Sequence, residues 1–102
     1  MAEEIYTLGR WRTKPGQEET FIAAWKELGE YFLGLPKPPQ KQGTLIQSLD
    51  DSQVFYSFGP WPTLEAVQEM RTNPATPERI GRLVALCEEA NPGSFRLVAT
   101  VP

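Results

Sequence analysis

Alternating side-chain character along residues 4–12 predicts a β-strand near the start of the chain. One face of this strand would carry Ile5, Thr7, Gly9 and Trp11, and the other would carry Tyr6, Leu8, Arg10 and Arg12. Pro15 and Gly16 then break the strand. Glu18 and Glu19 follow, and carboxylates in a first helical turn complement the positive end of the helix dipole. The chain therefore opens as a strand, a turn and a helix.

This first helix should cover residues 17–33. Its apolar side chains recur at spacings of four, three and four residues, at Phe21, Trp25, Leu28 and Phe32. Such a spacing places them on one helix face, which we expect to pack against a sheet. The three prolines of residues 34–43 then exclude a packed element there, because proline fixes φ and lacks an N–H. This loop is either a structural connector, which we favour, or a lid over a ligand site.

Residues 44–49 and 53–58 predict two strands of an antiparallel hairpin. Asp50, Asp51 and Ser52 suit the turn between them, so we expect the two carboxylates to be solvated rather than to form an acid–base pair. The second strand is apolar on both sides and needs cover on both sides. Its two faces would carry Val54, Tyr56 and Phe58 on one side and Phe55 and Ser57 on the other.

The C-terminal half predicts two helices and a strand. Thr63 is a candidate N-cap for a helix that ends near Arg71 and carries Leu64, Val67 and Met70 on one stripe. Thr76 and Pro77 give a second start signal. This helix would point Ile80, Leu83, Val84 and Cys87 inward, expose Glu88 and Glu89 at its end, and stop at Asn91-Pro92-Gly93. Residues 94–101 would form the last strand, with Phe95, Leu97, Ala99 and Val101 on one face. We find no internal repeat.

This order of elements predicts an α+β fold, the ferredoxin-like split βαβ arrangement with a four-stranded antiparallel sheet, as one domain over residues 1–102. Helices would cover one face of the sheet. The other face would be bare and apolar, and its best cover is a second copy of the same sheet. We therefore expect a homodimer.

Composition excludes several classes of function. Ten basic and thirteen acidic residues give a net charge of −3 without a strong basic cluster, which argues against nucleic-acid binding. The chain has no histidine and one cysteine, Cys87, so it has no Cys/His zinc site and no cysteine–histidine nucleophile pair, and we expect Cys87 to be buried. No apolar run is long enough to span a membrane, and no targeting segment is evident, so we expect a cytoplasmic protein.

Two segments resemble a known family. Residues 8–21, with the turn Lys14-Pro15-Gly16, are similar to the opening strand, turn and helix start of antibiotic biosynthesis monooxygenase-like domains. Residues 58–66, with Gly59-Pro60-Trp61, resemble that family's strand, tryptophan and helix start. The resemblance implies a dimeric α/β barrel with a pocket between sheet and helices. The family includes cofactor-free monooxygenases of polycyclic phenols, quinol oxidases, haem-degrading enzymes and members without known activity.

The resemblance does not extend to haem degradation. Haem-degrading members have a tryptophan that corresponds to Trp61, together with a histidine roughly ten residues later and an asparagine on the first strand. Those positions fall near Arg71 and Gly9 here. Arginine is not an axial haem ligand, and glycine has no amide side chain. We therefore expect no haem and no other cofactor.

Trp61 is the best candidate for a catalytic residue, because two prolines hold it rigidly at a strand end beside a helix start. We expect it to line a pocket rather than the core. Further aromatic surface could come from Trp11, Tyr56 and Trp25, although we favour packing as the role of each of these three aromatics taken alone. Arg10 or Arg12 could steady an anionic oxygen.

Two hypotheses follow. The first is a small cofactor-independent monooxygenase that acts on a phenolic or quinol-type aromatic molecule. The second is a non-catalytic ligand-binding or stress-associated dimer of the same fold, which the lack of histidine favours. A donor in the pocket able to activate a phenol would distinguish them.

Overall fold

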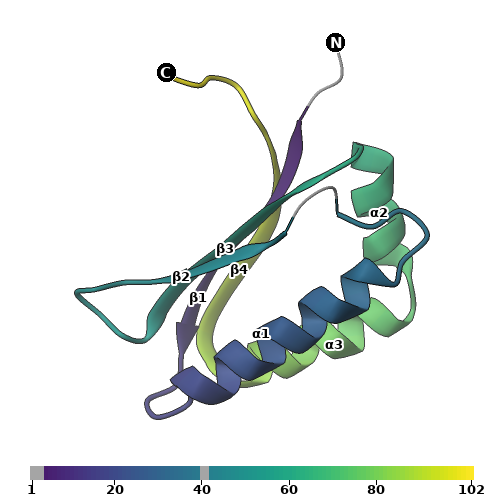
Figure 1. Cartoon of the computed structure of the whole chain (residues 1–102). Coiled ribbons are helices and arrows are strands. Elements are labelled where there is room, and N and C mark those ends of the chain that lie inside the picture. The colour runs from purple at the N-terminus through teal and green to yellow at the C-terminus, as the bar shows by residue number, and fades with distance from the viewer. Residues whose placement is uncertain (1–3, 40–41) are drawn as a thin grey trace.

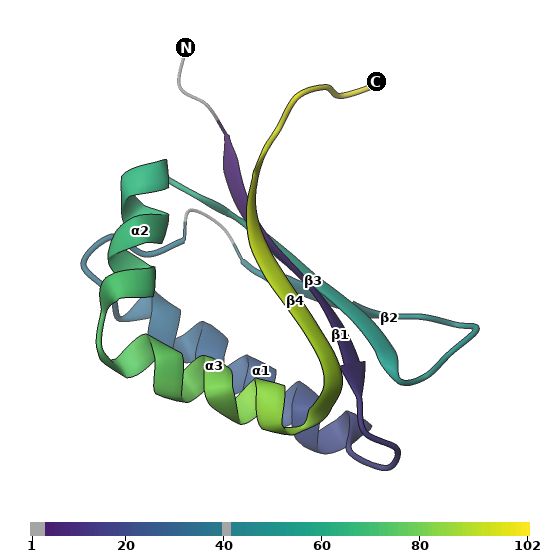
Figure 2. The same ribbon diagram turned by 180° about the vertical axis from the view of Figure 1, so that it is seen from behind.

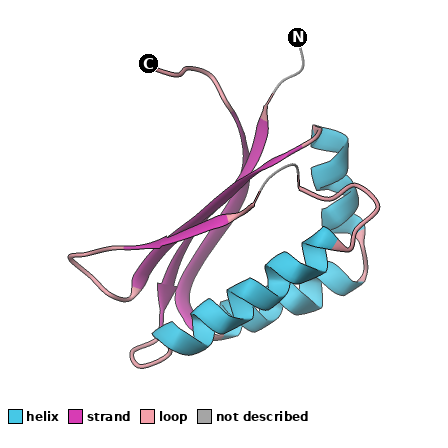
Figure 3. Ribbon diagram, in the orientation of Figure 1, coloured by secondary structure: helices cyan, strands magenta, loops and turns pink. Residues whose placement is uncertain are grey.

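The computed structural model of the chain describes residues 4–39 and 42–102. Its elements are β1 (Ile5–Thr13), α1 (Glu18–Leu33), β2 (Thr44–Gln47), β3 (Val54–Trp61), α2 (Leu64–Thr72), α3 (Ala75–Ala85) and β4 (Cys87–Arg96). Within the described residues the strands form a four-stranded antiparallel sheet in the order β2-β3-β1-β4. The helices gather on one side of this sheet (Figures 1 and 3). The predicted ferredoxin-like split βαβ fold is confirmed.

The first strand and helix agree with the sequence pattern. Trp11 and Thr13 are buried on the helix side of β1, and Arg10 and Arg12 alternate with them on the other side. Gly16 in the following turn has a φ of 82°, a left-handed conformation that favours glycine.

On the apolar face of α1, Phe21 and Leu28 are buried, and Trp25 and Phe32 are half-buried. The predicted loop after this helix is present as far as the structure describes it, and positions 40 and 41 lie outside the described residues.

The hairpin of β2 and β3 is also confirmed, but β3 runs three residues further than predicted and includes Pro60 and Trp61. Pairing with β2 ends where Thr44 faces Phe58, so Pro60 has a strand neighbour on one side only, opposite Tyr6 of β1. A proline that has no ladder partner on its N–H side costs no hydrogen bond.

The two helix starts differ from each other. Thr63 caps α2 as predicted, because its Oγ1 accepts a hydrogen bond of 3.0 Å from the backbone N–H of Ala66. Leu64 is exposed, contrary to the predicted stripe.

For α3 the predicted start is wrong: the helix begins at Ala75, whose N–H donates to the side-chain oxygen of Asn73 (3.0 Å). Thr76 lies inside the helix, buried, with its hydroxyl 2.9 Å from that of Tyr31.

The end of α3 is where the structure differs most from the sequence-based prediction. The helix stops at Ala85, Val84 is exposed, and Cys87 opens β4 instead of lying on a helix. Cys87 is buried as predicted, and this burial raises the pKa of its thiol. The segment expected to stop the helix lies within β4, where Pro92 is opposite Gly9 of β1. An edge strand tolerates proline, because one side of it needs no ladder bond.

The predicted last strand is correspondingly wrong beyond Arg96. Residues 97–102 have no regular secondary structure and continue past the end of β4 (Figure 2). Glu88 and Glu89 belong to β4 rather than to a helix end. Strand pairing with β1 over most of its length, which is a long-range interaction, overrides the local turn signals of this segment.

Two buried clusters form the core between sheet and helices. The first contains Trp11, Phe21, Leu28, Phe55, Leu83 and Cys87. The second contains Ile5, Trp61, Ala66, Val67 and Met70. Phe32 of α1 packs against both clusters, so the space between them lies beside this helix. Among the described residues, no helix has the length and apolar character that crossing a bilayer requires.

Candidate functional site

A cavity of about 830 Å³ lies between the inner face of the sheet and α1. Its volume falls within the range of roughly 300–1,000 Å³ that is typical of small-molecule sites. The sheet and α1 converge near the β1–α1 turn and diverge toward α2 (Figure 3). Side chains of β1, β3 and α1 form most of the wall. Pro39, Gln42 and Gly43 also line it, so the described part of the proline-rich segment contributes to the site.

Three indole rings line this cavity, from Trp11, Trp25 and Trp61. The structure therefore brings together three of the side chains that the sequence indicated. Trp25 projects from α1 toward Gly43, where an added Cβ would lie 3.5 Å from its ring. The inner-face position of Trp11 follows from the strand alternation, and that of Trp25 follows from the helix stripe.

Trp61 belongs to both the cavity wall and the core. Its side chain is 2% exposed, lies in the second buried cluster and packs edge-on against Phe32 at 5.3 Å between ring centroids. It is also among the residues that line the cavity. The sequence-based choice between pocket and core therefore does not apply, because one face of the indole can pack while another borders the cavity.

Two hydroxyl groups hold the strand tryptophans in place. Trp11 Nε1 donates to Ser57 Oγ at 2.9 Å, and Trp61 Nε1 donates to Thr7 Oγ1 at 3.0 Å. All four residues line the cavity. Neither indole N–H is therefore free to bind an anionic oxygen of a ligand.

Gly9 is needed for the position of Trp11. The Trp11 indole folds back over Gly9, so a Cβ at this position would lie 2.6 Å from Nε1 and 2.8 Å from two ring carbons. Any side chain here would displace the ring or close this part of the cavity.

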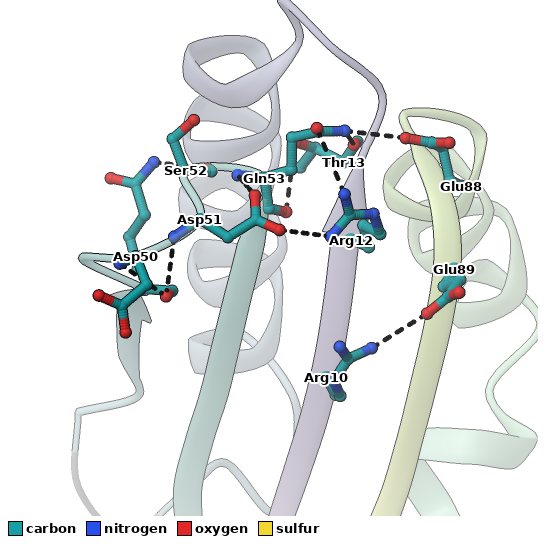
Figure 4. Close-up of polar contacts among 11 residues, drawn as sticks. Arg10, Arg12, Thr13, Asp50, Asp51, Ser52, Gln53, Glu88 and Glu89 are labelled. Atoms are coloured by element: carbon teal, nitrogen blue, oxygen red, sulfur yellow. Dashed lines mark hydrogen bonds and ion pairs between the residues drawn. The ribbon is translucent and has the colours of Figure 1, made fainter.

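Arg10, Arg12 and Tyr56 are not part of the cavity wall. They lie on the opposite face of the sheet, where carboxylates pair with the two arginines (Figure 4). Arg10 forms an ion pair of 3.0 Å with Glu89, and the Tyr56 and Glu89 side chains raise the pKa of its guanidinium.

Arg12 forms an ion pair of 2.6 Å with Asp51, and this hydrogen bond holds the pKa of the Asp51 carboxyl below its usual value. The Asp50–Asp51 turn is thus present, but Asp51 is paired instead of merely solvated.

Sequence reasoning missed Thr7 and Ser57 as site residues. The signal was available, because each is a hydroxyl residue on a strand face whose other side chains are mainly apolar. It also missed two cations at the cavity, Lys26 of α1 and Arg71 of α2. Neither forms an ion pair with another described residue. Gly9 and Arg71, the positions compared with the haem-degrading enzymes, both lie at this cavity.

No protein-family model and no curated protein matches the chain. Solved structures do match its fold. A point mutant of SnoaB, a cofactor-independent oxygenase from Streptomyces nogalater, aligns with a TM-score of 0.85 over 99% of both chains at 20% identity. A structure described as an antibiotic biosynthesis monooxygenase aligns with a TM-score of 0.72 over 95% of this chain and 99% of its own at 14% identity.

A Bacteroides thetaiotaomicron protein of unknown function aligns with a TM-score of 0.79 over 95% of this chain and all of its own, at 18% identity. The chain thus has the fold of structures described as antibiotic biosynthesis monooxygenases.

Proposed function

We propose that this protein is a small cofactor-independent monooxygenase that takes a phenolic or quinol-type aromatic molecule into the cavity between the sheet and α1. The observation that carries the proposal is the cavity itself, about 830 Å³ in volume and walled by three indole rings. Indoles offer flat apolar surface for stacking on an aromatic ring. The likeness of the fold to SnoaB, a cofactor-independent oxygenase, supports the same reaction class.

The reaction requires an ionised substrate that is shielded from water. A phenolate ring carbon attacks dioxygen, and the resulting hydroperoxide loses water to leave a quinone carbonyl. One oxygen atom enters the ring, the other leaves as water, and the ring supplies the four electrons. An apolar wall favours this step because it strengthens each hydrogen bond to the anion.

The proton of the phenol needs an acceptor, and the chain has no histidine. Among the described residues that line the cavity, Glu30 of α1 is the only one with a carboxylate side chain. We assign it the role of proton acceptor, either directly or through water. Lys26 and Arg71 add positive charge at the same cavity, which favours the anionic form of the substrate.

Tryptophan fluorescence tests ligand binding, because the three indoles lie at the cavity. Hydroxylated naphthalenes and anthrones should quench it in a saturable manner, and those that bind should then consume oxygen in the presence of the protein. Glu30→Gln should slow oxygen uptake while retaining binding. Saturable binding without oxygen uptake by any ligand would support the alternative, a non-catalytic ligand-binding protein.

We also infer that the active form is a homodimer. The sheet face opposite the helices exposes apolar side chains from β2, β3 and β4, namely those of Ile46, Tyr56, Phe58 and Phe95. A second copy of the same face would cover them. Sedimentation at micromolar concentration should show about twice the mass of one chain, and a monomer at all concentrations would rule out the dimer.

A further inference from the structure

A five-residue pattern occurs on both central strands of the sheet. A hydroxyl residue, a glycine and a tryptophan recur at alternate positions, as Thr7, Gly9 and Trp11 on β1 and as Ser57, Gly59 and Trp61 on β3. All six residues line the cavity. The two copies are not evident as an internal repeat in the sequence, because they are short and lie fifty positions apart.

Strand pairing relates the two copies by an approximate two-fold axis. Thr7 lies opposite Gly59, and Gly9 lies opposite Ser57. Each tryptophan donates its indole N–H to the hydroxyl of the other strand, at 2.9 and 3.0 Å. The two glycines differ in their neighbours, since Gly9 accommodates the Trp11 indole and Gly59 accommodates the Cα of Gly43. The hydroxyl–indole pairs are the part that repeats.

These hydrogen bonds determine what each hydroxyl can still do. An indole nitrogen only donates, so each hydroxyl oxygen acts as the acceptor and its own O–H remains a donor. Among the described residues, neither the Thr7 nor the Ser57 hydroxyl has an acceptor. Ser94, opposite Thr7 on β4, does not supply one, because its buried Oγ has no partner either. Ser57 is buried and Thr7 is half-buried, and a buried donor left without an acceptor is costly, so an acceptor at the cavity is favoured above all beside Ser57.

We propose that the Thr7 and Ser57 hydroxyls, and not the indole N–H groups, donate to two acceptor oxygens on opposite edges of the ligand, and that this ligand is a quinone-type aromatic molecule, which is what the proposed step forms from a phenol. The inference rests on the proposed function in taking the cavity as the ligand site. Diagonal residues of an antiparallel pair lie about 7–8 Å apart, which a six-membered ring with an oxygen at each end can bridge. An approximately two-fold pair of donors suits a ligand with two like oxygens.

The test compares naphthoquinone, naphthol and naphthalene, which present two, one and no oxygens on the same ring system. Wild-type protein should bind them in that order of affinity in fluorescence titrations. Ser57→Ala and Thr7→Val should each lower the affinity for naphthoquinone by roughly 3–10-fold, as expected for one lost hydrogen bond. Both variants should leave the affinity for naphthalene nearly unchanged. Ser57→Thr and Thr7→Ser retain the hydroxyl and should retain the preference for naphthoquinone.

Trp61→Phe separates the two kinds of donor. It removes an indole N–H but keeps the Thr7 hydroxyl, so the ratio of naphthoquinone to naphthalene affinity should persist. A loss of this ratio in Trp61→Phe, with no loss in Thr7→Val or Ser57→Ala, would overturn the inference. Equal wild-type affinities for the three probes would also overturn it while leaving the aromatic cavity intact. Absence of binding by all three would overturn the proposed function with it.

Discussion

Gly9→Ala should destabilise the protein, although alanine within a strand is normally more stabilising than glycine. The new Cβ would lie 2.6 Å from Trp11 Nε1 and 2.8 Å from Cε2 and Cζ2. The indole cannot easily move, because Trp11 is 4% exposed and packs on the Phe21 ring at 5.6 Å. Relief of the clash therefore requires a shift of the core.

The magnitude follows from three contributions. Overpacking of a core costs about 1–3 kcal/mol. Displacement of the indole also breaks its hydrogen bond to Ser57, and a buried donor left unpaired costs about 1–3 kcal/mol. Alanine also lowers the conformational entropy of the unfolded chain, and this offsets about 0.4–1 kcal/mol of the lost stability. We expect a net loss of about 2–4 kcal/mol, which corresponds to a fall in melting temperature on the order of 10–20 °C for a domain of this size.

Gly81→Ala is the matched control, because it makes the same chemical change without a clash. Gly81 lies within α3, and a Cβ there would meet no atom within 4 Å. Alanine in a helix interior is favoured over glycine by about 0.5–1 kcal/mol, so this variant should gain stability. Urea denaturation and thermal melts at one fixed protein concentration measure both variants. A Gly9→Ala protein as stable as wild type would refute the assigned contact with Trp11.

Three further predictions concern other contacts. Trp61→Ala should cost about 3–5 kcal/mol in urea denaturation because the ring is buried against Phe32, and a much smaller loss would show that it lines the cavity without contributing to the core. Asp51→Asn should lower the neutral-pH melting temperature slightly. Because Arg12 lowers the pKa of Asp51 in the folded state, this stabilisation is present above the unfolded pKa of about 3.9 and is lost as pH falls through the lower folded value. Melts of the two proteins should therefore converge in acid, and a pH-independent difference would contradict the ion pair. Thr63→Ala should cost about 1 kcal/mol through loss of the α2 cap, and Thr63→Ser should restore most of it.

Local patterns in the sequence were sufficient for the strands and faces that depend on local alternation. The faces of β1 and β3, the apolar side of α1 and the Thr63 cap all follow from periodicity or from one side chain. The end of α3 was missed because Asn91-Pro92-Gly93 is an equally good stop signal for a helix and an acceptable segment of an edge strand. Only the pairing of β4 with β1 distinguishes the two.

The candidate site was predicted in part. Trp11 and Trp25 reach the cavity because their faces were predicted correctly. Arg10 and Arg12 were grouped with Trp11 by proximity in sequence, although strand alternation already placed them on the opposite face. Their carboxylate partners Glu89 and Asp51 are distant in sequence, and no local pattern indicates such pairs.

The register of β1 on β3 shows why Thr7 and Ser57 needed the structure. A slip of one residue would turn every apolar side chain of β1 to the wrong face, so hydrophobic patterning excludes it. A slip of two residues would preserve both faces, and patterning alone does not exclude it. In one of the two directions, however, such a slip would separate Trp11 from Ser57 and Trp61 from Thr7, and so leave two indole N–H groups buried without acceptors. The crossed hydrogen bonds therefore help to fix the register, and the same register places both hydroxyl donors at the cavity.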